Sequence, residues 1–384
     1  MYKKLGVIMA TAALLVLAGA GCAPQGGNEQ TPATADDKPV TTEPIKVGWM
    51  GPLTGDVATV GVACKQAAEM AVKEINDAGG ISGRKLEVIY EDSACDAKTG
   101  SNAGNKLINA DKVVAIIGDL CSGPTLAVAP VAEQNKVLML ATGATAPSIT
   151  TAGDYIFRIV PSDSYQGKLG AELVYNTLGK KKAAVLYAKA DYTEGLANIF
   201  TEEYKKLGGE VVLSESFLQT ARDLKTQLTK VKNSGAEVLY FPTYTEAGVA
   251  ALKQAKDLGL KAQIVGPETF DDPKMQAADG ANGVIYTMPA SVSNDSFKTK
   301  YLSATGLKEM PVYVTQSYDA PYILANVLKQ VGTDPEKIKS EMYNIKNYAG
   351  VSGTIGFDGD GDLSTAQYEI RVIKNNKGEK YATE

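Results

Sequence analysis

The sequence contains no histidine among its 384 residues. Histidine is the commonest general base in enzymes and the commonest protein ligand of transition metals, so its absence argues against most catalytic and metal sites. The phosphate-binding loop G-x-x-x-x-G-K-[ST] and the nucleophile motif G-x-S-x-G are also missing, and no G-x-G-x-x-G follows the first strand-like segment. We therefore expect a protein that is not an enzyme and that uses no cofactor and no metal.

An excess of positive charge and long apolar segments are also missing from most of the chain. The net charge of -5 gives no reason to expect binding to nucleic acid. Beyond residue 43 no stretch is long and apolar enough to span a bilayer. With 44% hydrophobic residues the chain can bury a large core, and its length favours two domains over one.

The first part of the chain has the features of an export signal. Two lysines precede an apolar run that ends in small residues, which predicts a signal peptide over 1–21. The residues before Cys22 resemble a lipobox, although a glycine stands where leucine is preferred. Cleavage without lipidation and an uncleaved membrane anchor are the alternatives. We expect a lipid on Cys22, a disordered tether over 22–43 and an extracytoplasmic protein that the lipid holds at the membrane.

Apolar strand-like runs alternate with amphipathic helical segments along the rest of the chain. This alternation is typical of doubly wound α/β proteins with parallel sheets. The expected strands form two series, 45–49, 85–90, 113–117 and 137–140 in the first, then 183–187, 210–213, 238–241, 263–265, 284–288 and 368–373 in the second. Helices over 293–304 and 316–331 are expected to return to the first series. The prediction is therefore two parallel-sheet α/β lobes.

Two turns with hydroxyl side chains follow buried strands of the first series. The carboxyl ends of parallel strands are the edge at which open α/β sheets bind ligands. Ser122 begins a predicted helix over 122–134, so its hydroxyl and the first backbone N–H groups would point at an incoming anion. In the next turn, Gly143 offers a carbonyl and Thr145 a hydroxyl to an ammonium group. The pattern predicts a site for a small zwitterion, although helix capping alone would also explain Ser122 and Thr145.

Several short motifs recur in the order that one protein family shows. They are Ile45–Gly48, Gly51–Gly55, Asn76–Ile81, Glu91–Asp96, Cys121–Ser122, Gly143–Thr145, Tyr192–Gly195 and Gly266–Glu268. On these residues the chain resembles the leucine/isoleucine/valine-binding proteins of ABC importers, which have the type I periplasmic binding protein fold. The resemblance covers about residues 43 to 380.

The resemblance implies where the two lobes begin and end. It places lobe 1 at 44–163 plus 292–363 and lobe 2 at 164–291 plus 364–384. The chain would cross between the lobes near Val160, Pro289 and Gly361, and three such crossings make a hinge.

The resemblance also implies a ligand site between the lobes. Its expected residues are Ser122, Gly143, Ala144, Thr145 and Val60 from lobe 1, and Tyr192, Tyr244 and Glu268 from lobe 2. Glu268 would pair with the ammonium of a branched-chain amino acid, which a monomeric receptor would then deliver to an ABC permease. Val60 stands where several relatives carry an aromatic residue, which widens the expected side-chain pocket. A binding protein or sensor for another amino acid or an amide is the alternative.

Three cysteines follow Cys22. The resemblance pairs Cys95 with Cys121, which suits an oxidising compartment outside the cytoplasm. Cys64 lies on the apolar stripe of a predicted helix, which favours a buried, inert thiol over a reactive one.

The acidic segment Asp358–Asp362, with Glu369 further along, imitates a calcium-binding EF-hand loop. Leu363 stands where such a loop requires glycine, and no predicted helix flanks the segment. A tight turn at the third crossing is the better interpretation.

Overall fold

The computed structural model describes residues 42–290 and 294–382. The predicted signal peptide over 1–21, Cys22 and nearly all of the expected tether over 22–43 lie outside these residues. Within 42–290 and 294–382, no helix combines the length and the hydropathy that a membrane crossing requires.

Lobe 1 is built on a five-stranded sheet with the order β2-β1-β3-β4-β5, in which all neighbours are parallel. The strands are β1 (Ile45–Gly51), β2 (Leu86–Asp92), β3 (Ala115–Ile117), β4 (Leu138–Ala141) and β5 (Ile156–Arg158). The sequence predicted the first four of these but not β5, which has only three residues.

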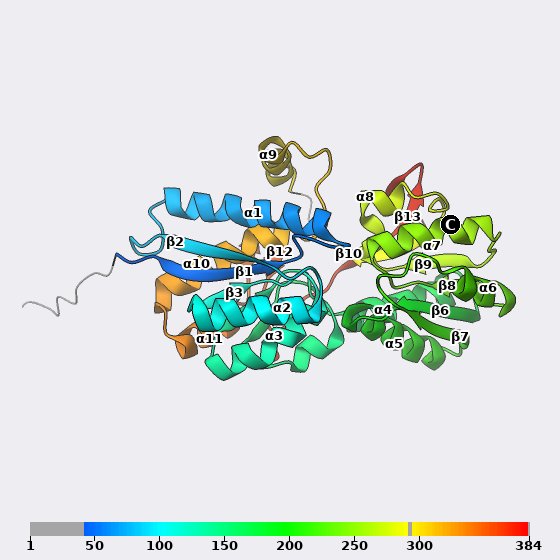
Figure 1. The fold of residues 1–384 in the computed structure, drawn as a ribbon, viewed down its shortest axis with the longest axis horizontal. Helices are drawn as coiled ribbons and strands as arrows, with labels where there is room; N and C mark the ends of the chain where they lie inside the picture. Colours follow the sequence, from blue (N-terminus) through cyan, green and yellow to red (C-terminus); the bar gives the residue numbers. More distant parts are fainter. Residues whose placement is uncertain (1–41, 291–293, 383–384) are drawn as a thin grey trace, which may run out of the picture. The chain divides into compact units, whose positions relative to one another are not determined.

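Helices cover both faces of this sheet. In Figure 1, α1 (Ala58–Asp77) and α10 (Val314–Val331) lie on one face, with α2 (Ala97–Asn105) and α3 (Ser122–Asn135) on the other. Successive side chains of a strand point to opposite faces. Accordingly Ala115 and Ile117 pack in the core beside α1 and α10, whereas Ile116 packs beside α2 and α3. Burial on both faces explains why β3 and β4 are apolar throughout. The remaining elements of lobe 1 are η1 (Lys106–Ala110), η2 (Pro147–Thr151), α9 (Asp295–Thr305), α11 (Pro335–Asn344), β11 (Tyr348–Gly350) and β12 (Gly353–Ile355).

Lobe 2 contains a seven-stranded sheet with the order β14-β13-β10-β9-β8-β6-β7. Its strands are β6 (Lys182–Ala188), β7 (Glu210–Phe217), β8 (Val238–Tyr240), β9 (Gln263–Gly266), β10 (Ile285–Pro289), β13 (Tyr368–Lys374) and β14 (Lys377–Lys380). Its helices are α4 (Asp163–Glu172), η3 (Leu173–Thr177), α5 (Asp191–Lys206), α6 (Lys225–Asn233), α7 (Thr245–Asp257), η4 (Glu268–Asp271) and α8 (Pro273–Gln276).

The second sheet is parallel except at one edge. β13 runs antiparallel to β10, and β14 runs antiparallel to β13. The other pairs are parallel, which confirms the expected parallel-sheet lobe. The last two strands form a hairpin whose turn residues Asn375 and Asn376 have φ values of 50° and 61°. Asparagine tolerates this left-handed conformation, which tight hairpin turns require.

The main chain passes between the lobes after β5, after β10 and before β13. The third segment is hydrogen-bonded to both of the others. The Arg158 N–H donates to the Gly361 carbonyl at 3.1 Å, and the Ala290 N–H donates to the Gln367 carbonyl at 2.8 Å. The three segments therefore form the hinge expected from the sequence, whereas the residue numbers given for the lobe boundaries stay predictions.

A disulfide joins Cys95 to Cys121, the residue just before α3. Its sequence separation is 26 residues. Cys64 is a free thiol in the core of lobe 1, and burial raises its pKa to about 12.

We expect the double variant Cys95→Ser/Cys121→Ser to lose about 3.5 kcal/mol of unfolding free energy, because the bridge restricts the unfolded chain. Urea unfolding of the variant beside the oxidised wild type measures this difference. A loss below about 1 kcal/mol would contradict the chain-entropy argument for this bridge.

Candidate functional site

One cavity is lined by residues of both lobes. Six of the eight residues predicted for the site line it, namely Val60, Ser122, Gly143, Tyr192, Tyr244 and Glu268. The other lining residues are Pro52, Val57, Leu120, Cys121, Thr245, Thr269, Asp272, Val312 and Tyr313. The atom-free space is about 580 Å³, and part of it is open to solvent.

Ala144 and Thr145 do not belong to this lining. Ala144 packs in the core beside α3, and the Thr145 hydroxyl donates to Oδ2 of Asp163 at 2.9 Å. A role of these two residues in ligand binding therefore stays a prediction.

The lobe 1 side of the cavity is formed where β3 and β4 end. Ser122 is the first residue of α3, and its hydroxyl accepts a hydrogen bond from the Ala146 N–H at 3.1 Å. The hydroxyl therefore keeps its own hydrogen to donate. The first N–H groups of a helix have no partner within the helix, so Ser122 and the start of α3 favour an anion.

Gly143 allows the two turns to approach each other closely. A Cβ atom at this position would lie 2.9 Å from Leu120 Cδ2 and 3.0 Å from the Leu120 carbonyl oxygen. Any larger residue would push the Gly143 turn away from the start of α3.

Glu268 dominates the lobe 2 side. It begins η4 directly after β9, and only 3% of its surface is exposed. Its Oε1 accepts hydrogen bonds from the hydroxyls of Tyr192 at 2.8 Å and Tyr313 at 2.9 Å. Its Oε2 accepts from Nε2 of Gln166 at 2.7 Å. Tyr313 precedes α10, so its hydrogen bond to Glu268 connects the two lobes.

Gln166 and Tyr313 were not predicted from the sequence. Gln166 lies on α4 and is fully buried, and Tyr313 adopts a left-handed conformation with φ of 68° at the start of α10. Neither residue belongs to a recognisable motif, and Tyr313 is one of nineteen tyrosines. No signal in the sequence distinguishes them.

Burial controls the charge of the site. It raises the pKa of Glu268, although the hydrogen bonds from Tyr192, Gln166 and Tyr313 oppose this change. Burial and the charge of Glu268 together raise the pKa of Asp163 well above its ordinary value. In the turn that follows β3, burial raises the pKa of Asp119 to about 6. Because none of the described residues lining the cavity is lysine or arginine, these acids have no cationic partner in the cavity wall.

Apolar side chains form another part of the wall. They are Pro52, Val57, Val60, Leu120 and Val312, all from lobe 1. On the opposite lobe the rings of Tyr192 and Tyr244 lie with their centroids 5.7 Å apart. The cavity therefore combines an anion-favouring helix start, a buried carboxylate and an apolar wall.

The acidic segment near the third crossing forms a turn. Oδ1 of Asp358 accepts from the N–H groups of Asp360 at 2.9 Å and Asp362 at 3.0 Å. Among the residues that the structure describes, no three side chains are grouped as potential ligands of a metal ion.

Comparisons with known proteins agree with this architecture. The sequence profile of the "Periplasmic binding protein" family matches residues 44–379. A leucine-, isoleucine-, valine-, threonine- and alanine-binding protein of Pseudomonas aeruginosa is 31% identical over 86% of this chain and 90% of its own length.

Solved structures are also similar. A leucine-binding protein of Thermotoga maritima superposes with a TM-score of 0.82 and 27% identity, covering 88% of this chain and 98% of its own. A branched-chain amino acid transporter substrate-binding protein of Streptococcus pneumoniae, solved with isoleucine, has a TM-score of 0.80 and 28% identity over the same shares.

Proposed function

Because the chain belongs to the periplasmic binding protein family, we propose that it captures a branched-chain amino acid outside the cytoplasm and delivers it to an ABC permease. One observation carries the proposal. The buried carboxylate of Glu268 and the start of α3 at Ser122 line the same cavity, and no lysine or arginine lines the described wall. An α-amino acid supplies both of the charges that these two groups lack.

The carboxylate of the amino acid would lie at Ser122. There it would accept a hydrogen bond from the hydroxyl, which already accepts from Ala146 and keeps a hydrogen to donate. The N–H groups and the dipole at the start of α3 add to this attraction. The Gly143 turn, which also lines the cavity, would lie beside the α-carbon.

The ammonium group would pair with Glu268. Tyr192, Tyr313 and Gln166 hold the carboxylate from several directions, so its oxygens are fixed before the ligand arrives. Hydrogen bonds to charged groups contribute about 1.5–3 kcal/mol each, and leaving the ammonium unpaired in the cavity would cost at least as much. Since Ser122 and Glu268 belong to different lobes, ligand binding favours the closed arrangement.

An aliphatic side chain suits the remaining wall. Val57, Val60 and Val312 face the cavity from lobe 1, so the side chain of leucine, isoleucine or valine would bury its surface against them. The names of the relatives support this choice, because leucine, isoleucine and valine are given for the Pseudomonas aeruginosa protein and the Streptococcus pneumoniae structure contains isoleucine. The proposed function is binding and transfer, without chemical conversion of the solute.

Isothermal titration calorimetry tests this function. The protein is unfolded and refolded to remove any bound solute, then titrated with leucine, isoleucine, valine, alanine, phenylalanine and acetamide. We expect a branched-chain amino acid to bind most tightly, with a Kd of about 1 µM or lower, which corresponds to about -8 kcal/mol. Tighter binding of phenylalanine or acetamide would replace the branched-chain assignment, and no binding by any amino acid would refute it.

We further propose that Cys22 carries a lipid that holds a monomeric receptor at the membrane surface. The support is the resemblance of the preceding residues to a lipobox. Mass spectrometry of the exported protein is expected to find a diacylglyceryl group on Cys22. Fractionation is expected to show that the variant Cys22→Ala is no longer held at the membrane. An unmodified Cys22 would exclude this form of anchoring.

A further inference from the structure

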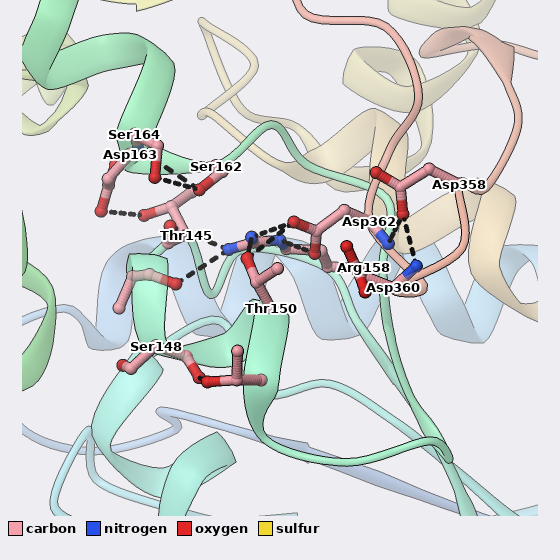
Figure 2. Close-up of polar contacts among 12 residues, drawn as sticks. Thr145, Ser148, Thr150, Arg158, Ser162, Asp163, Ser164, Asp358, Asp360 and Asp362 are labelled. Atoms are coloured by element: carbon pink, nitrogen blue, oxygen red, sulfur yellow. Dashed lines mark hydrogen bonds and ion pairs between the residues drawn. The ribbon is translucent and has the colours of Figure 1, made fainter.

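Arg158 is a fully buried arginine at the end of β5, outside the cavity wall. Its Nε and Nη2 donate to the two carboxylate oxygens of Asp362 at 2.6 and 2.5 Å, and Nη2 also donates to the Thr150 hydroxyl at 2.7 Å. Nη1 donates to the carbonyls of Thr145 and Ala146, both at 2.9 Å. All five N–H donors of a guanidinium are thereby used. Figure 2 shows Arg158 with Thr145, Thr150 and Asp362 around it.

Asp362 brings the third crossing segment to this arginine. The turn over Asp358–Asp362 sets its position, because the Asp358 carboxylate accepts the Asp362 N–H and the Asp358 N–H donates to the Asp362 carbonyl at 2.9 Å. The main chain of Arg158 is also bonded to this segment, through the Gly361 carbonyl at 3.1 Å. The acidic segment that imitates a calcium loop therefore presents a carboxylate to Arg158.

The other partners of Arg158 lead towards the cavity. The Thr145 carbonyl also accepts the Asp163 N–H at 2.9 Å, and the Thr145 hydroxyl donates to Asp163, the first residue of α4. The Ala146 N–H donates to the Ser122 hydroxyl at 3.1 Å. One hydrogen-bonded chain thus connects the third crossing segment with the Gly143 turn and the start of α3.

We propose that Arg158 and Asp362 are positioning residues for ligand binding. They fix the Gly143 turn and Ser122 relative to the first and third crossing segments, so that the lobe 1 half of the site keeps its geometry when the hinge bends. Neither residue lines the cavity, and neither would contact the ligand. The inference rests on the proposed function, because it assigns these residues to the binding of the same amino acid.

The variant Asp362→Asn tests the proposal, with Asp319→Asn as the matched control. Asp319 is another acid of lobe 1, and it accepts hydrogen bonds from the N–H groups of Val351 and Ser352. It does not line the cavity. Both variants are expected to melt at lower temperatures than the wild type. Calorimetry with leucine, well below these temperatures, is expected to give at least about tenfold weaker binding for Asp362→Asn, because loose support of a site disturbs its geometry.

For Asp319→Asn the affinity is expected to stay within about twofold of the wild type, as for independent distant sites. Equal affinity for Asp362→Asn and the wild type would overturn the proposal, since a purely stabilising ion pair predicts that result. If Asp362→Asn does not fold, Thr150→Val replaces it, because it removes a hydroxyl that accepts from Arg158 and donates to Asp362. For Thr150→Val we expect about threefold weaker binding of leucine, and an unchanged affinity would overturn the proposal.

Amide hydrogen exchange separates this inference from the proposed function, because it needs no ligand. In Asp362→Asn or Thr150→Val, faster exchange is expected at the Arg158 and Asp163 amides, which donate to Gly361 and Thr145. Asp319→Asn should leave both amides protected. If the wild type binds no amino acid, the proposed function fails, and the positioning role in binding fails with it. If the wild type binds leucine but the Arg158 and Asp163 amides exchange no faster in the variants, the connection alone is overturned.

Discussion

The variant Glu268→Gln is expected to bind leucine about 100-fold more weakly than the wild type or worse. Glutamine keeps the size of the side chain but removes the charge that would face the ligand's ammonium group, and removing one partner of a buried charged pair costs about 2–5 kcal/mol. Isothermal titration calorimetry measures the change directly. Affinity within about twofold of the wild type would remove Glu268 from the proposed site.

The control for this variant is Asp271→Asn. Asp271 lies in the same short helix, but its carboxylate pairs with the Tyr286 hydroxyl at 2.6 Å and with Arg371, and it does not line the cavity. Its affinity for leucine is expected to stay unchanged. Loss of binding in both variants would indicate a general disturbance of η4 rather than a role of the Glu268 charge.

The melting temperature gives a second readout for Glu268→Gln. Burial raises the pKa of Glu268, so the folded protein holds this proton more tightly than the unfolded chain does. The corresponding stability is present below the ordinary glutamate pKa and is lost as the pH rises through the raised pKa. Glutamine escapes this loss, so the variant is expected to gain stability relative to the wild type as the pH rises from 4 to 7.

Leucine binding is expected to release protons at mildly acidic pH. In the unliganded protein, burial raises the pKa of Glu268 and of Asp163, and each charge raises the cost of the other. An ammonium group at Glu268 favours the ionised form and lowers these values again. The affinity for leucine should therefore increase as the pH rises above the ordinary pKa of a carboxyl group, because Glu268 and Asp163 then lose their protons.

Calorimetry in buffers of different ionisation enthalpy measures the protons released. The number should fall in Glu268→Gln, in which only Asp163 of the pair still titrates. A pH-independent affinity between pH 4.5 and 7, without proton release, would show that Glu268 is already fully ionised before the ligand binds.

Much of the fold follows from the sequence because its central strands are buried on both faces. The runs at 113–117 and 137–140 are apolar throughout, and they contain β3 and most of β4. β5 was missed because it has three residues and ends in Arg158, whose charge is typical of an exposed position. Its burial depends on Asp362, which lies far along the chain, and no local pattern reports such a partner. The antiparallel edge at β13 was likewise invisible in the strand pattern alone.

The site was predicted in part. Ser122 and Glu268 each follow a strand that the sequence shows clearly, and the structure places both in one cavity. Thr145 was expected there too, but it is not among the lining residues, and its hydroxyl donates to Asp163. Gln166 and Tyr313 reach Glu268 from helices whose packing only the tertiary structure determines.

The most direct measurement compares leucine with two analogues that each lack one charge. Isoamylamine keeps the ammonium group but lacks the carboxylate, and 4-methylpentanoate keeps the carboxylate but lacks the ammonium group. If Ser122 and Glu268 bind the two ends of a zwitterion, leucine binds and both analogues bind at least about 100-fold more weakly, since each leaves one half of the site unpaired. Binding of 4-methylpentanoate as tightly as leucine would contradict the account, because the buried carboxylate of Glu268 would then have no role in capturing the ligand.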